Sequence, residues 1–234
     1  MGLNDPDGNA FGRWLELTVL HGLMKSSRIE FTGFEYIPQT GPLIIIINHI
    51  AFQDPVLILG SLPRRTIPLA KVEAFNSGIW SYLMKVYGTI PVRRGEVDMG
   101  AIKSALRILK DGGALLLAPE GTRSRNYQLQ PGKNGATILA LRSGAPIVPI
   151  GITGTHQIVA HFKKLKRPPV HFSVGKPFCL RRRDTGNRRP TREEISDMTR
   201  EAMYRLAAQL PPEFRGVYRD VDQVTFQYSV PGEG

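Results

Sequence analysis

The chain has 234 residues, 41% of them hydrophobic, and a formal net charge of +11. This size allows one sizeable hydrophobic core and does not require two. Because no run of about 18 apolar residues occurs, we expect no membrane-spanning helix. The first ten residues hold Asp5 and Asp7 but no basic residue, so we expect no signal peptide. A single cysteine, Cys179, excludes an internal disulfide and is typical of a reducing compartment.

Residues 10–25 are predicted to form an amphipathic helix after a disordered start. Apolar residues recur there near helical spacing, and Phe11 and Trp14 are among them. Such a helix either lies at a membrane interface or, in the more common alternative, packs on the protein core. We therefore divide the chain into an N-terminal tail with an amphipathic membrane-interface helix, residues 1–30, and one folded domain, residues 31–234.

Five consecutive aliphatic residues, 43–47, follow the turn signal Gly41-Pro42. Four of them are β-branched, which is typical of a strand buried on both faces at the centre of a sheet. Open α/β folds place their ligands at the carboxyl ends of such strands. His49 and, five residues later, Asp54 follow this strand at that end.

His49 and Asp54 form a candidate catalytic pair. The unperturbed pKa of histidine suits proton transfer near neutral pH, and a nearby carboxylate fixes the tautomer and stabilises the imidazolium. Because residues four or five positions apart return to one side of a helical turn, we expect the two side chains to pair. In a purely structural alternative, His49 ends the strand and Asp54 caps a helix. A metal site is a third interpretation, but no third His, Cys or carboxylate lies at ligand spacing.

Strands and helices alternate along the rest of the chain. Besides residues 43–47, we predict strands at residues 28–34, 66–70, 89–92, 114–118, 146–152 and 170–174. We predict helices at residues 55–60, 75–84, 99–109, 136–141 and 192–210. This alternation, without repeats or linker-like composition, predicts an α/β fold with a single domain. In this fold we expect a mostly parallel central sheet with helices on both faces, and the amphipathic helix precedes it at the N-terminus.

The positive charge is concentrated in residues 151–192. This stretch holds eleven Lys and Arg residues against one acidic residue, Asp184. Such a patch suits an anionic partner, and the alternatives are a membrane surface, a nucleic acid and a phosphorylated substrate. Charge alone does not choose among these partners.

Three polar clusters follow predicted strand ends: His49 with Asp54, Arg93 with Arg94, and Glu120 with Arg123. Because parallel strands end at one edge of a sheet, we expect the clusters to converge on one site. Guanidinium groups bind phosphate oxygens in pairs, so the arginines indicate a phosphate-bearing acceptor; the alternative is solvated surface charge. Gly121 lets the backbone approach a ligand closely, and the Thr122 hydroxyl can donate a hydrogen bond to it.

Four segments stand in order between about Phe31 and Thr155: Asn48-His49-(four residues)-Asp54, Gly88–Arg94, Pro119–Ser124 and Ala145–Ile150. They resemble the four ordered blocks of the glycerolipid acyltransferases, the first being the HX4D motif. The resemblance is greatest to the lysophosphatidic acid acyltransferases, or 1-acyl-glycerol-3-phosphate acyltransferases. It implies a fold like that of glycerol-3-phosphate acyltransferase, with residues 31–234 as the acyltransferase domain.

The resemblance also implies a reaction. An acyl group passes from acyl-CoA or acyl-carrier protein to the free hydroxyl of 1-acyl-glycerol-3-phosphate, which gives phosphatidic acid in phospholipid synthesis. His49 is then the general base, supported by Asp54, and no acyl-enzyme forms. The implied substrate-binding residues are Arg93, Arg94, Glu120, Gly121, Thr122, Arg123 and, from a Lys-x-Gly segment, Lys133. No metal and no cofactor are implied.

Two features depart from the family pattern. Ala51 stands where the family often has serine, so any hydrogen bond from that hydroxyl is absent. The segment before the first block is short and leaves room for about one amphipathic helix. Membrane attachment then rests on that helix and the basic stretch, a combination suited to reversible binding to anionic membranes. We therefore expect a peripheral, monotopic location at the cytoplasmic side of the cell membrane.

Other functions remain open at this point. Within the family, the alternative acceptors are glycerol-3-phosphate, another lysophospholipid and an acylated amino-acid lipid. A transacylase with a phospholipid donor would use the same His49–Asp54 pair. Outside the family, the alternative is a non-catalytic, basic protein that binds lipids or nucleic acids. The basic stretch has few aromatic residues and no recognisable nucleic-acid-binding motif, so we expect no nucleic-acid partner.

Overall fold

The structure is a computed structural model that describes residues 28–76, 81, 84–85, 87–93, 98–162, 167–181 and 189–232. The predicted helix at residues 10–25 lies outside these residues, and so does Arg94. The helix and the substrate-binding role of Arg94 therefore stay predictions. No helix in the described part of the chain combines the length and the apolar character needed to cross a membrane.

The described residues form one sheet of nine strands: β1 (Arg28–Thr32), β2 (Leu43–Ile47), β3 (Thr66–Lys71), β4 (Ile90–Val92), β5 (Ala114–Leu117), β6 (Ile147–Thr153), β7 (Pro169–Val174), β8 (Phe178–Leu180) and β9 (Ser229–Pro231). Their order is β1-β7-β6-β2-β5-β3-β4, with β8 beside β6 and β9 beside β8. The pairs from β6 to β4 are parallel, as is β1 with β7, whereas β6 pairs antiparallel with β7 and β8. The predicted mostly parallel sheet is confirmed.

The strand β2 lies at the centre of this sheet, between β6 and β5. All five of its side chains are at most 1% exposed. Ile44 and Ile46 enter the hydrophobic core on one face of the sheet, and Leu43, Ile45 and Ile47 enter the core on the other. Both faces are therefore covered, which is why the strand is apolar at every position rather than at alternate ones.

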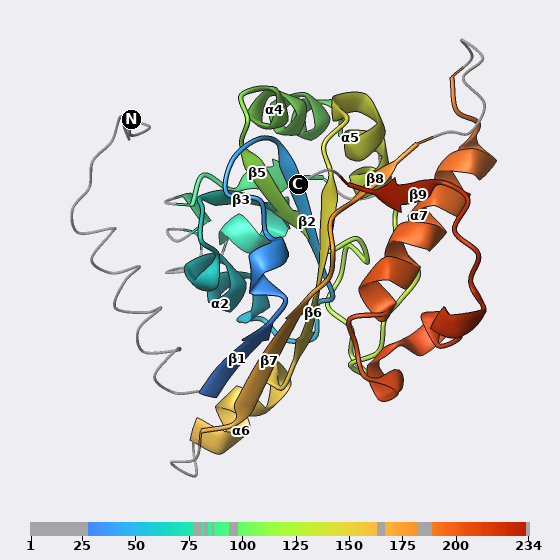
Figure 1. Ribbon diagram of the computed structural model, residues 1–234. Coiled ribbons are helices and arrows are strands. Elements are labelled where there is room, and N and C mark those ends of the chain that lie inside the picture. The colour runs from blue at the N-terminus through green and yellow to red at the C-terminus, as the bar shows by residue number, and fades with distance from the viewer. Residues whose placement is uncertain are drawn as a thin grey trace.

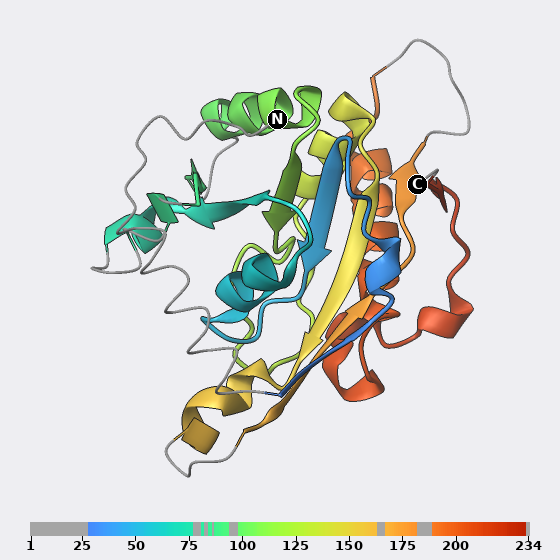
Figure 2. The ribbon, with the colours of Figure 1, turned by 60° about the vertical axis from the view of Figure 1, so that its left-hand side comes forward.

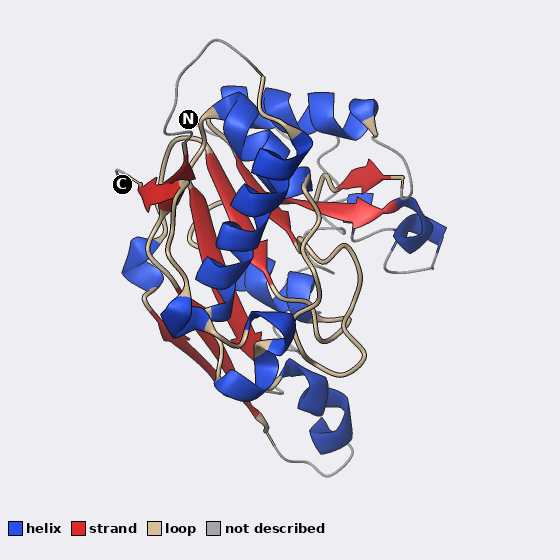
Figure 3. Ribbon diagram, turned by 90° about the vertical axis from the view of Figure 1, so that its right-hand side faces the viewer, coloured by secondary structure: helices blue, strands red, loops and turns tan. Residues whose placement is uncertain are grey.

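Helices cover the two faces of the sheet. They are α2 (Asp54–Ser61), α4 (Met99–Lys110), α5 (Gly135–Ser143), α6 (Ile158–Phe162) and α7 (Arg192–Ala207). Apolar side chains of α4, α5 and α7 share the core of Ile44, whereas Leu57 and Ile58 of α2 share the core of Ile45. Figure 1 shows α2 and α7 on opposite sides of the central strands, and in Figure 3 α7 lies across the sheet.

Several elements differ from the prediction. Most of the helix predicted at 75–84 lies outside the described residues, and Val72–Asn76 forms a short 3-10 helix instead. The strands β8 and β9 and the helix α6 were not predicted, because elements of three to five residues carry too little periodicity. β7 and β8 run in the same direction along β6, where the Gly175 N–H bonds to the Pro149 carbonyl at 2.8 Å.

A buried carboxylate on α7 holds the C-terminal strand β9. Glu201, which is 5% exposed, accepts hydrogen bonds from the N–H groups of Gln227 (2.6 Å), Tyr228 (3.0 Å) and Ser229 (2.8 Å).

Glu201→Ala leaves these donors without their acceptor, so we expect the free energy of unfolding to fall by about 3 kcal/mol. Urea denaturation measures the change. The matched control Glu193→Ala, at an exposed position of the same helix, should change it by less than about 0.5 kcal/mol. Equal effects of the two substitutions would contradict this role.

Candidate active site

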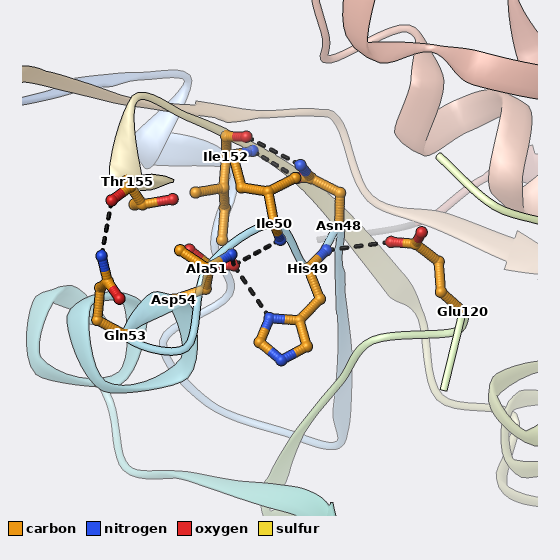
Figure 4. A network of polar contacts seen from close by, with 9 residues as sticks. All are labelled: Asn48, His49, Ile50, Ala51, Gln53, Asp54, Glu120, Ile152 and Thr155. Atoms are coloured by element: carbon orange, nitrogen blue, oxygen red, sulfur yellow. Dashed lines mark hydrogen bonds and ion pairs between the residues drawn. The ribbon is translucent and has the colours of Figure 1, made fainter. Parts of the chain in front are cut away.

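The candidate site lies where three neighbouring parallel strands, β6, β2 and β5, end at one edge of the sheet. Asn48 and His49 follow β2, Pro119 and Glu120 follow β5, and Thr155 follows β6. Figure 4 shows the side chains of this edge around the imidazole of His49. The predicted convergence of polar groups at strand ends therefore holds for the loops after β2 and β5.

The His49 imidazole and the Asp54 carboxylate are paired. Nδ1 of His49 lies 3.0 Å from Oδ2 of Asp54. The same oxygen accepts the N–H groups of Ile50 and Ala51, both at 2.7 Å. The Asp54 side chain is fully buried and that of His49 is 22% exposed. The carboxylate therefore both closes the turn and holds the imidazole, rather than capping α2, and the catalytic role of the pair stays a prediction.

The local geometry differs from the expected shared helical turn. Residues 51–53 form a bend and a turn after three residues without regular structure, and α2 begins only at Asp54. The two side chains meet because this turn curls back, not because they share one face of a helix.

The His49 ring is oriented for proton uptake at Nε2. A hydrogen bond to Asp54 assigns the proton of the neutral ring to Nδ1, which leaves the lone pair on Nε2. In Figure 4, Nε2 points away from Asp54. No hydrogen bond within the described residues occupies Nε2. The pair thus presents a base whose tautomer is set by a buried carboxylate.

Two amides fasten the turn that carries His49 to the end of β6. The Asn48 side chain donates to the Ile152 carbonyl (2.9 Å) and accepts the Ile152 N–H (2.6 Å). Nε2 of Gln53 donates to the Thr155 carbonyl at 2.6 Å. Sequence reasoning assigned no role to Gln53 or Thr155, because the partners are about 100 residues apart and no motif links them.

Glu120 supports the backbone of His49. Its Oε1 accepts the His49 N–H (3.1 Å), its Oε2 accepts the Gln130 N–H (2.9 Å), and the residue is 2% exposed. Burial raises the pKa of Glu120 from 4.5 to about 7, although these two N–H groups oppose the shift. Both oxygens are thus occupied by backbone donors, and direct contact of Glu120 with substrate stays a prediction.

The raised pKa of Glu120 makes protein stability depend on pH. Between pH 4.5 and about 7 the native carboxyl keeps a proton that the unfolded chain has released, so the free energy of unfolding falls as the pH rises through this window. The contribution is about 3 kcal/mol in full. We expect Glu120→Gln to remove it, and urea denaturation across this pH range measures the slope. The exposed Glu213→Gln is the control, and an unchanged slope in Glu120→Gln would contradict the assignment.

Gly121 and Lys133 lie beside the His49 turn. Gly121 has a φ of +67°, and a Cβ there would lie 3.0 Å from the Lys133 side chain. The Lys133 N–H donates to the Pro119 carbonyl (2.8 Å), and the Ser124 N–H donates to the His49 carbonyl (2.8 Å). The structure thus joins the loop after β5 to His49. Thr122 and Arg123 are exposed between these anchored positions.

Arg93 and Arg94 are not joined to this site by any contact that the structure describes. Arg93 follows β4, is exposed, and its N–H donates to Asp98 at 2.9 Å. β4 pairs with the second half of β3, and both strands extend sideways from the central ones in Figure 2. Arg94 lies outside the described residues. The expected grouping of Arg93 and Arg94 with Arg123 therefore stays a prediction.

Sequence reasoning also missed an aromatic contact near the site. Tyr127 has a φ of +63°, and its ring stacks on His156 with centroids 4.3 Å apart. Left-handed backbone is strained in a residue other than glycine. Burial lowers the pKa of His156, and the charge of Asp54 opposes the shift. Two loops far apart in sequence form this contact, so no local pattern could have indicated it.

Comparisons with known proteins agree with the segments found in the sequence. Residues 28–153 match the family described as Acyltransferase. A chloroplastic 1-acyl-sn-glycerol-3-phosphate acyltransferase of Brassica napus is 31% identical over 137 residues, which are 56% of this chain and 39% of that protein. The Borreliella burgdorferi protein of that name is 30% identical over 131 residues, 55% and 52% of the two chains. The human alpha form is 31% identical over 139 residues, 58% and 48%.

The chain spans about half the length of the curated relatives it matches. Among solved structures, the 1-acyl-sn-glycerophosphate (LPA) acyltransferase PlsC of Thermotoga maritima superposes with a TM-score of 0.59. The alignment covers 93% of this chain and 83% of that one, at 20% sequence identity. This likeness supports the α/β fold.

Proposed function

This chain belongs to the acyltransferase family, and from that premise we propose that it acylates the free hydroxyl of 1-acyl-glycerol-3-phosphate, giving phosphatidic acid. The donor is a thioester, either acyl-CoA or acyl-carrier protein. The observation that carries the proposal is the His49–Asp54 pair at the end of β2. The names of the similar proteins support the choice of acceptor.

In the proposed reaction, Nε2 of His49 takes the proton of the acceptor hydroxyl as its oxygen attacks the thioester carbonyl. Asp54 stabilises the imidazolium that forms. The tetrahedral intermediate then expels the thiolate, and the proton on Nε2 passes to the sulfur. One C–O bond forms and one C–S bond breaks, so no acyl-enzyme and no cofactor are needed.

The acceptor phosphate is proposed to bind Arg123, with Lys133 beside Gly121 and with Arg93 and Arg94 as further cations. Arg123 is exposed three residues after Glu120, and no carboxylate of the described residues pairs with it. A free guanidinium can bind two phosphate oxygens at once. The Thr122 hydroxyl and the Gly121 backbone are proposed to line the same acceptor site.

We further propose that the protein acts in phospholipid synthesis as a peripheral protein on the cytoplasmic side of an anionic membrane. Exposed cations of the basic stretch support this, namely Arg167, Lys176, Arg181, Arg189 and Arg192. Each cation near an anionic surface contributes about 1 kcal/mol to binding.

A donor and acceptor panel tests the proposed function. Purified protein receives acyl-CoA, acyl-carrier protein or a phospholipid as donor, and 1-acyl-glycerol-3-phosphate, glycerol-3-phosphate or another lysophospholipid as acceptor. Mass spectrometry of the lipid products is expected to show phosphatidic acid from a thioester donor. Product only from the phospholipid donor would indicate a transacylase, and no acylated product in any combination would refute the proposal.

Loss of the Arg123 guanidinium should weaken acceptor binding. For Arg123→Ala we expect KM for 1-acyl-glycerol-3-phosphate to rise about 10- to 100-fold, since a charge-assisted hydrogen bond contributes about 1.5–3 kcal/mol. The kcat should change little, and steady-state kinetics measure both. The matched control is Arg65→Ala, an exposed arginine before β3 at the opposite edge of the sheet. A KM equal to that of the control would rule out phosphate binding by Arg123.

A further inference from the structure

The two oxygens of the Asp54 carboxylate have different surroundings. Oδ2 has three partners, whereas Oδ1 is buried and has no hydrogen-bond partner among the described residues. Thr155, which is 0% exposed, carries a hydroxyl in the same condition. Buried polar atoms in proteins are nearly always satisfied, by protein or by internal water. Each of these two oxygens therefore calls for a hydrogen-bond partner.

Thr155 is held close to Asp54 by the fold. Its carbonyl accepts the Gln53 side chain at 2.6 Å, and Gln53 directly precedes Asp54. In Figure 4 Thr155 lies on the side of Asp54 that faces away from the His49 ring. Nδ1 of the next residue, His156, is also buried and has no hydrogen-bond partner in the described part of the chain. An internal water commonly makes about three hydrogen bonds, so one water can serve more than one buried polar atom.

We propose that Thr155 is a positioning residue of the site, whose hydroxyl binds Oδ1 of Asp54 through one internal water. This inference rests on the proposed function and deepens it. A carboxylate held at one oxygen only can rotate about its Cβ–Cγ bond, because that torsion is broad. With Oδ1 held as well, Oδ2 stays on Nδ1 of His49 and the imidazole keeps one tautomer.

The buried location of Thr155 decides which kinetic constant should change. The side chain is not exposed and cannot touch substrate, so it acts through Asp54 and His49 alone. Thr155→Val removes the hydroxyl and nearly preserves the volume, and the carbonyl that Gln53 binds remains. We expect kcat to fall about 10-fold with KM unchanged, because small misplacement of a catalytic group is costly. Thr155→Ser keeps the hydroxyl and should restore kcat.

The nitrogen-15 spectrum of the His49 ring tests the inference without substrate. Wild-type protein and Thr155→Ser should show His49 in the Nδ1–H tautomer, and Thr155→Val should show a mixture of tautomers. Thr155→Ala, which also lacks the hydroxyl, replaces valine if that variant does not fold. Wild-type kcat and a wild-type His49 spectrum in the variants without the hydroxyl would overturn the proposal. If no acyl transfer occurs at all, the spectrum still decides the role of Thr155.

Discussion

Replacing His49 with alanine is expected to lower kcat for acyl transfer to 1-acyl-glycerol-3-phosphate by at least about 1,000-fold. The ring is the one base that a buried carboxylate orients at this edge, within the residues that the structure describes. Without it, the acceptor hydroxyl must attack while still protonated or lose its proton to water. Initial rates with purified protein, measured by product mass, give the ratio.

The fold should survive this substitution. Asp54 still accepts the N–H groups of Ile50 and Ala51, and Glu120 still accepts the backbone N–H at position 49. Circular dichroism and the urea midpoint should therefore stay close to wild type. His161→Ala, on the short helix α6, is the matched control and should retain activity. Acyl transfer by purified His49→Ala at near the wild-type rate would remove the mechanism.

Asp54→Asn is expected to lower kcat by about 100- to 10,000-fold. The substitution keeps the size of the side chain but removes the charge that stabilises the imidazolium. If the amide nitrogen takes the place of Oδ2, it also faces the N–H groups of Ile50 and Ala51. Steady-state kinetics measure the loss. Asp111→Asn, an exposed carboxylate at the end of α4, is the control and should leave kcat unchanged.

The double variant sharpens this prediction. If Asp54 acts only through His49, then His49→Ala with Asp54→Asn should be no slower than His49→Ala alone. Independent roles would instead multiply the two losses. A multiplied loss would therefore contradict the assignment of Asp54 as the group that orients and supports the imidazole.

Local sequence was sufficient for the parts of the fold that repeat a simple pattern. The run at 43–47 predicted a strand buried on both faces, and β2 lies there at the centre of the sheet. A helix was predicted at 99–109, and α4 begins at Met99, where the side chain of the preceding Asp98 caps it by accepting the Ala101 N–H. Such features depend on residues a few positions apart, which periodicity and capping preferences describe well.

Local sequence determined the candidate site only in part. The spacing of His49 and Asp54 predicted their pairing, but the reason was wrong, because a curled turn rather than a shared helix face brings them together. Sequence also placed Glu120 near His49 through the common edge of parallel strands. It did not indicate that backbone N–H groups take both Glu120 oxygens.

Residues distant in sequence were assigned by the tertiary structure alone. Thr155 meets Gln53 only because β6 pairs with β2, and Tyr127 meets His156 only because two loops pack at the end of that pair. Composition and spacing determined a parallel α/β sheet and an imidazole at its central strand end. The hydrogen-bond partners of the oxygens around that imidazole depend on contacts between residues about 100 positions apart. Local patterns carry no information about such contacts.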